Sequence, residues 1–85
     1  MGERDEDQLE EIMRIRGVVA ENLERAIERA VEERGLSKTE LALRAGVSRS
    51  MLYDVLGKKS AATTDFLTKV AGVLGLEVRE LFDEE

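Results

Sequence analysis

The side chains best suited to molecular recognition in this 85-residue chain lie in one short stretch around residue 50. Leu52 and Val55 have the spacing of an inward helix face, with Met51 at its flank. The outward side of the same helix then carries four side chains with polar groups: Arg49, Ser50, Tyr53 and Asp54. An arginine can donate two hydrogen bonds to O6 and N7 of guanine, and a serine can bond to either base type. Asp54 can accept a bond from N4 of cytosine or orient Arg49, although phosphates repel its carboxylate.

Catalytic chemistry is poorly supported by the composition. The chain has no histidine and no cysteine, which removes the commonest general base, the commonest metal ligand and every thiolate. It contains neither a G-x-x-x-x-G-K phosphate loop nor a G-x-S-x-G nucleophile turn. Its acidic residues fall at helical spacings among arginines, which is typical of a solvated helix face. We therefore expect no enzymatic activity, no metal site and no cofactor.

Two short helices are predicted to position the outward side chains. Ser37 can cap a helix that begins at Lys38, with Glu40 reaching back to the cap, and Gly46 can end it in a left-handed conformation. Ser48 is a second cap candidate for a helix that Gly57 closes. Two helices joined by about three residues around a glycine are the sequence form of a helix-turn-helix, whose second helix, here at about 48–56, enters the DNA major groove.

The stretch resembles the helix-turn-helix of phage-repressor and Cro-like proteins, the XRE family. That family has apolar residues at five places, a small residue at one and a glycine at another. The chain meets all seven, with Leu41, Ala45, Val47, Leu52 and Val55, with Ala42, and with Gly46. The resemblance extends back to Val18 and forward through Phe66–Phe82. It implies an all-α, compact five-helix domain of the lambda-repressor type that binds duplex DNA as a transcriptional regulator, here expected to be a repressor.

The resemblance also implies where DNA would be contacted. It places base-reading side chains at Arg49, Ser50 and Asp54, with Tyr53 beside them. Helix amino-termini and nearby cations are expected to hold the phosphates, because free N–H groups and positive charge both favour anions. The residues expected to contact the DNA backbone in this way are Lys38, Thr39, Arg44, Ser48, Lys58 and Lys59. Five basic side chains neutralise few phosphates, so we expect a homodimer on a palindromic operator.

The charge distribution favours the same stretch, although the net charge of −6 opposes nucleic-acid binding. Residues 1–35 hold six basic and eleven acidic side chains, and residues 61–85 hold two and six. Residues 36–60 hold five and two, so only this part of the chain is net positive. With 42% hydrophobic residues and no apolar run near 18 residues, we expect a single cytoplasmic domain that does not enter a membrane.

The predicted organisation has four parts: a charged flexible tail at 1–8, a helical extension at 9–17, the helix-turn-helix domain at 18–82 and an acidic tail at 83–85. Gly17 marks either a weak point in one long helix or a joint between two. The extension carries an apolar strip, Leu9, Ile12 and Met13, that the resembled fold does not need.

Three explanations of this strip stay open. It forms the dimer interface, it folds back over its own domain, or the interface lies instead on the last helix, with Val78 and Phe82. A different class of function also stays open, in which the fold serves as a protein-interaction module such as an antitoxin that binds a toxin.

Overall fold

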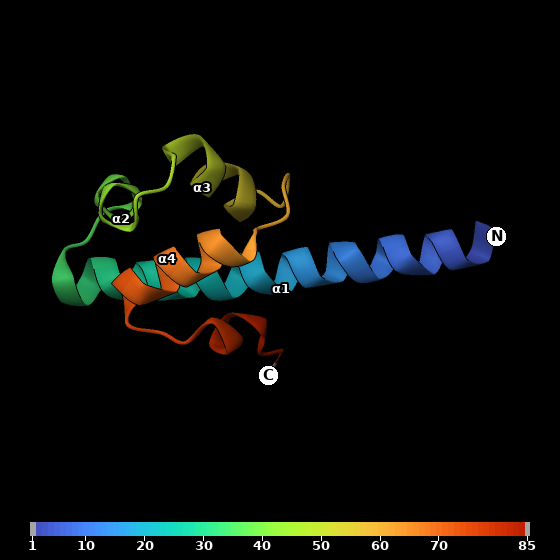
Figure 1. Cartoon of the computed structure of the whole chain (residues 1–85). Coiled ribbons are helices and arrows are strands. Elements are labelled where there is room, and N and C mark those ends of the chain that lie inside the picture. The colour runs from blue at the N-terminus through green and yellow to red at the C-terminus, as the bar shows by residue number, and fades with distance from the viewer. Residues whose placement is uncertain (1, 85) are drawn as a thin grey trace.

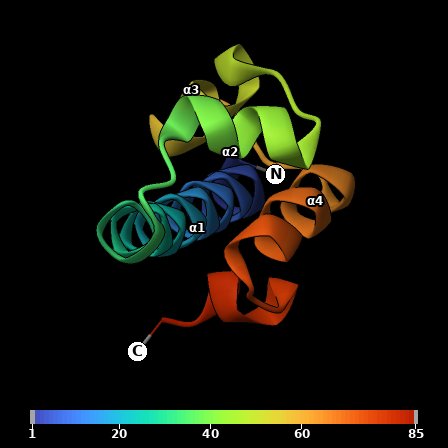
Figure 2. The ribbon, with the colours of Figure 1, turned by 90° about the vertical axis from the view of Figure 1, so that its left-hand side faces the viewer.

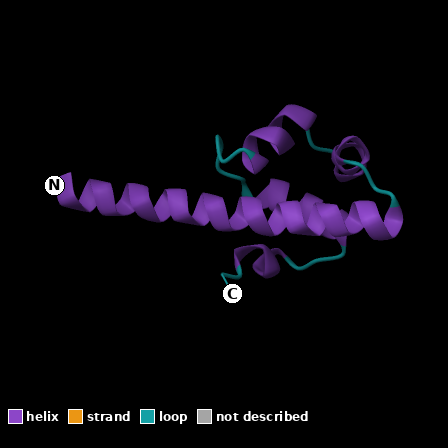
Figure 3. Cartoon of the chain, turned by 180° about the vertical axis from the view of Figure 1, so that it is seen from behind, coloured by secondary structure: helices purple, strands orange, loops and turns teal. Residues whose placement is uncertain are grey.

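The computed structural model describes residues 2–84, with side chains described from residue 6 onward. These residues form four α-helices and one 3-10 helix: α1 (Gly2–Arg34), α2 (Lys38–Ala45), α3 (Arg49–Leu56), α4 (Thr64–Leu74) and η1 (Val78–Phe82). No strand occurs among the described residues (Figure 3). The predicted all-α class is therefore confirmed.

The prediction of five α-helices is wrong, because the last segment is a 3-10 helix. It has only five residues, too few to close a series of α-helical hydrogen bonds. Instead, the Glu80 N–H donates to the carbonyl of Glu77 at 3.0 Å, and the side chains of these two residues form a reciprocal capping box. Short i, i+3 bonds are sufficient here because Leu81 is fully buried and holds the segment in place.

Helix α1 is one continuous helix of 33 residues, so of the two alternatives for Gly17 the structure has a position within one long helix and no joint. The charged start of the chain, predicted to be a flexible tail, belongs to this helix from Gly2 onward; Met1 lies outside the described residues. Glutamate, arginine and glutamine are good helix formers, and adding residues to an existing helix is much easier than nucleating a new one. At the other end, Asp83 and Glu84 follow η1 as an exposed segment, and Glu85 is outside the described residues.

One hydrophobic core holds all five elements together. Leu23, Leu41, Leu52, Val70 and Leu81 are each at most 1% exposed, and each comes from a different element. Figures 1 and 2 show α2 and α3 on one side of α1 and η1 on the other, with α4 alongside α1 between them. Every element therefore buries its apolar face against neighbours, which supplies most of the stability of so small a domain.

Two polar side chains of α1 fasten the carboxy-terminal half of the chain. The Asn22 Nδ2 donates to the carbonyls of Leu81 and Asp83 at 2.9 and 2.7 Å. Arg34 donates to the carbonyl of Val73 at 2.8 Å, near the end of α4. Carbonyls at helix ends lack partners within their helix, so these bonds satisfy them and tie distant segments to α1.

The amino-terminal half of α1 extends beyond the rest of the domain (Figure 1). The molecule consequently measures 47 Å along its longest axis and 27 and 18 Å across. Leu9, Ile12 and Met13 lie on this projecting part and are all exposed, so the strip does not fold back over its own domain.

Candidate nucleic-acid interface

Local side-chain bonds fix the geometry of the helix-turn-helix. Ser37 Oγ accepts from the Glu40 N–H at 3.1 Å, and Ser48 Oγ accepts from the Met51 N–H at 2.9 Å, as predicted for two amino-terminal caps. Gly46 has the predicted left-handed conformation, with φ of 72°. The predicted return bond from the Glu40 side chain is replaced by an ion pair with Arg44 at 3.7 Å. Helix α3 therefore starts at a fixed angle to α2.

The end of α3 differs from a simple glycine stop. The helix ends at Leu56, as predicted, but Gly57 has φ of −84° and Lys58 adopts the left-handed conformation, with φ of 64°. The Lys59 N–H then donates to the carbonyl of Asp54 at 2.9 Å. A Cβ at Gly57 would lie 3.3 Å from the carbonyl oxygen of Tyr53, a tight contact that the glycine avoids. Lys58 and Lys59 thus follow directly from the turn that closes α3.

The structure places the predicted base-reading side chains as the helix pattern requires. Leu52 and Val55 are buried, whereas Arg49, Ser50 and Tyr53 are exposed on the outward face of α3. Asp54 is half-buried at the edge of this face. The face therefore offers a guanidinium, a hydroxyl and a phenol to a partner, with one carboxylate beside them.

Lys38 connects three elements at this face. Its Nζ lies 3.3 Å from Glu24 Oε2 on α1 and 5.6 Å from the centre of the Tyr53 ring on α3. A cation over an aromatic face is attracted by the ring quadrupole. The start of α2 is thereby linked to the outward face of α3, and Tyr53 is held beneath a positive charge.

Carboxylates of α1 lie beside two of the predicted phosphate-binding lysines. Besides the Lys38–Glu24 pair, Lys58 Nζ lies 3.8 Å from Glu21 Oε2. The sequence analysis missed this pairing, although Gly17, Glu21 and Glu24 stand at i, i+4 and i+7 and share one edge of a helix. Gly17 is where the Lys58 side chain crosses α1, since a Cβ there would lie 3.9 Å from Lys58 Nζ.

The remaining residues predicted to contact the DNA backbone are accessible to solvent. Thr39 lies in the first turn of α2 and Ser48 caps α3, and both are exposed. Within the described part of the chain, Arg49 and Lys59 have no carboxylate within 4 Å. These two cations are therefore the ones most available to a phosphate or a base.

The residues predicted for a dimer interface divide into three groups. Ile12 and Phe82 come together, with Ile15, at an open pocket of about 150 Å³ between α1, the α3–α4 loop, α4 and η1. Leu9 and Met13 lie further out on α1 and are exposed. Val78, by contrast, packs against the core. The amino-terminal strip and the end of η1, predicted as alternatives, thus belong to one surface.

The described residues offer neither a cluster of metal ligands nor a membrane-spanning helix. Among the described residues, no group of three or more histidine, cysteine, aspartate or glutamate side chains could hold a metal ion. None of the described helices is both long and apolar enough to span a membrane.

Comparison with known proteins identifies the family. The family model described as Helix-turn-helix matches residues 27–81, which include α2, α3 and α4 and most of η1. Neither the curated proteins nor the solved structures gave a match. The matched family consists of DNA-binding regulatory domains and is not a family of enzymes. With this match over most of its length, the chain belongs to the helix-turn-helix family of XRE-type, Cro-like proteins.

Proposed function

We propose that this protein is a sequence-specific, duplex-DNA-binding transcriptional regulator, acting as a repressor in the cytoplasm, and that α3 reads the major groove. The observation that carries the proposal is the division of α3 into two faces. Leu52 and Val55 anchor the helix in the core, while Arg49, Ser50 and Tyr53 stand on its outward face. In helix-turn-helix proteins this face of the second helix contacts base edges.

Contacts to the DNA backbone would come from both sides of α3. The amino-termini of α2 and α3 offer free N–H groups near Thr39 and Ser48, and Lys59 follows the carboxy-terminal turn. Lys38, Arg44 and Lys58 can exchange their carboxylate partners for phosphates, because exposed ion pairs contribute little free energy. Such contacts would fix the position of α3 without carrying sequence information.

Two copies would be needed for tight binding. The protein carries a net charge of −6, and three of its cations near α3 lie beside its own carboxylates. Few phosphates can therefore be neutralised by one copy, and affinity depends strongly on that number. A homodimer on a palindromic site doubles it.

Selection of bound sites from random duplex DNA tests the proposal directly. We expect an enriched palindromic sequence whose affinity falls steeply as salt rises from about 50 to 200 mM, because bound phosphates release counterions. A selection that enriches no sequence, together with no measurable binding at low salt, would contradict the proposed function.

A second function is favoured by one observation, the exposed apolar surface at Ile12, Ile15 and Phe82. A protein-interaction module, such as an antitoxin that holds a toxin, would use a surface of this kind. The two functions differ in salt dependence, because an apolar protein interface responds little to salt. A binding partner whose affinity for this protein is the same at about 50 and at about 200 mM salt would favour the second function.

A further inference from the structure

Five of the large apolar side chains that the described chain leaves exposed lie together at one end of the domain. We call them the apolar patch: Leu9, Ile12, Met13, Ile15 and Phe82. Their exposed fractions run from 37% for Ile15 to 58% for Leu9. Contiguous exposed apolar surface of this kind marks an interaction site in small proteins.

The apolar patch continues the face of α1 that is buried elsewhere. Leu9, Ile12, Arg16, Val19 and Leu23 follow one another at intervals of three and four residues, so they share one side of the helix. Val19 and Leu23 are covered by the domain, whereas Leu9 and Ile12 project beyond it. The exposed half of α1 therefore has the pattern of a helix that packs against a partner.

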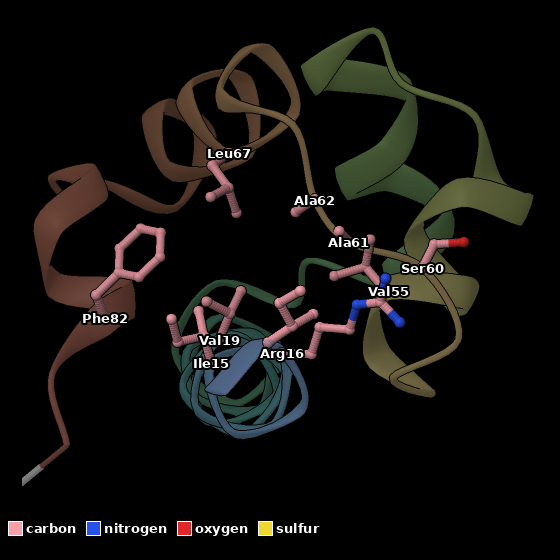
Figure 4. A pocket seen from close by; sticks show the side chains of 10 residues that line it. Ile15, Arg16, Val19, Val55, Ser60, Ala61, Ala62, Leu67 and Phe82 are labelled. Carbon is pink, nitrogen blue, oxygen red and sulfur yellow. The ribbon is translucent and has the colours of Figure 1, made fainter. Parts of the chain in front are cut away.

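Arg16 stands at the boundary between the covered and the uncovered half. Figure 4 shows its side chain between Val19 and Val55, with Ile15 and Phe82 on the other side of the pocket. Its Nε is buried and has no hydrogen-bond partner within the described chain. Arg16 as a whole is half-buried, and its positive charge would attract an acidic group brought to this end of the apolar patch.

We propose that the apolar patch pairs with the same patch of a second copy of this chain, with the two α1 helices antiparallel. By sequence, residues 3–11 of α1 hold six acidic and one basic side chain, whereas residues 12–17 hold two arginines and no acid. Antiparallel pairing brings the acidic start of each helix to Arg14 and Arg16 of the other copy. Parallel pairing would place the two acidic starts side by side, where like charges repel.

The proposed pairing would also stabilise the projecting half of α1. A helical segment of about 15 residues is marginal on its own in water, so burial of its apolar side contributes stability that the domain does not supply. The contact is isologous, because the same patch serves both copies around a two-fold axis. It deepens the proposed function by naming the partner that would set the spacing of two α3 helices, but its test needs no DNA.

The test is the mass of the full chain in solution, measured by sedimentation equilibrium between about 1 and 100 µM without DNA. Ile12→Glu should weaken dimer formation at least tenfold, because it places a charge in the paired surface. Val31→Glu is the matched control, since Ile12 and Val31 are both 47% exposed on α1 and Val31 lies outside the apolar patch. Circular dichroism should show both variants folded.

The expected result is a dimeric wild type, a dimeric Val31→Glu and a monomeric Ile12→Glu. The proposal is overturned if the wild type is monomeric throughout this range, or if Ile12→Glu is as dimeric as the control. Binding of DNA is measured separately, so failure of the dimer and failure of DNA binding give different results.

The relative orientation of the two α1 helices is tested by disulfide cross-linking. The chain has no cysteine, so an introduced cysteine is the one thiol that can react. Positions 8 and 12 are four residues apart, so they share a face of α1. In an antiparallel pair, position 12 lies near the two-fold axis and position 8 does not. Ile12→Cys should therefore form a disulfide-linked dimer on oxidation, and Gln8→Cys should not. Equally efficient linkage through position 8 would show parallel helices and overturn the antiparallel arrangement.

Discussion

Arg49 and Lys59 are the two cations among the predicted DNA contacts that have no carboxylate partner in the described chain, yet they stand in different places. Arg49 lies at the start of α3 on its outward face, whereas Lys59 follows the turn after the helix. We expect a side chain at the first position to contact a base edge and one at the second to contact phosphates. Their substitution should therefore have different effects on specificity.

Arg49→Ala should reduce affinity for the selected sequence by about 1–3 kcal/mol and relax preference at one base position. Lys59→Ala should weaken binding to all sequences alike and lower the slope of log affinity against log salt by about one unit. Titration of matched and single-mismatch duplexes at several salt concentrations measures both. If Arg49→Ala lost affinity equally for every duplex, Arg49 would not be a base reader.

Glu21 and Glu24 are expected to act against DNA binding, because each lies beside a lysine that would otherwise be free for a phosphate. Glu21→Gln and Glu24→Gln should each raise affinity for DNA, by up to about fivefold at low salt, since an exposed ion pair and its repulsion of phosphate are both modest. Glu33→Gln is the control, because Glu33 is exposed on α1 and makes no ion pair. Unchanged affinity in both variants would show that phosphates never approach these lysines.

At the scale of elements, α3 depends on its inward face and η1 depends on α1. Leu52 has no exposed surface, and the carbonyls of Leu81 and Asp83 both receive hydrogen bonds from Asn22. Substitutions at the two sites should destabilise the domain for different reasons. An acidic residue in place of Leu52 buries a charge, whereas loss of the Asn22 amide leaves two carbonyls without donors.

Leu52→Asp should unfold the domain, since burying an unpaired carboxylate costs more than a domain of this size can absorb. Met51→Asp is the comparison, because Met51 is adjacent but 36% exposed, and it should remain folded. Thermal melting followed by circular dichroism distinguishes them. A cooperative melt of Leu52→Asp near the wild-type temperature would mean that the inward face of α3 is misassigned.

Asn22→Ala should lower the free energy of unfolding by about 2 kcal/mol, because its amide loses together one bond to η1, at Leu81, and one to Asp83 just after η1. Glu32→Ala, on the exposed side of the same helix, should change it by less than about 0.5 kcal/mol. Urea denaturation of the two variants gives both values. Equal stabilities would show that Asn22 does not hold η1 in place.

In the whole molecule, the long helix α1 takes part both in the hydrophobic core and in the proposed pairing of two copies. Its carboxy-terminal half contributes buried side chains to the core, and its amino-terminal half carries most of the apolar patch. The core begins at Val19, so stability of the domain and pairing of two copies should be separable.

Removal of residues 1–16 should leave a domain that still melts cooperatively, because every buried side chain of the described chain lies at or after Val19. Its melting temperature should fall, since the contacts of Ile15 and Arg16 at the pocket are lost. Differential scanning calorimetry checks this. A truncated chain without a cooperative transition would place part of the folding nucleus in the projecting half of α1.

Features that depend on neighbours within one or two helical turns could be predicted from the sequence alone. Ser37, Gly46 and Ser48 cap or end the helices as predicted, and Leu52 and Val55 point inward, because caps and helix faces follow from spacings of three and four residues. The same local patterns were sufficient to predict the family, which the comparison confirmed. The roles of the outward side chains in binding DNA stay predictions.

Contacts between residues far apart in the sequence could not be predicted and became known from the fold. Lys38 reaches both Glu24 and Tyr53, and Asn22 bonds to a carbonyl 59 residues away. Ile12 and Phe82, predicted as parts of alternative interfaces, lie at one pocket. Such contacts depend on how helices pack around a shared core, and residues far apart in sequence carry no local spacing that records it.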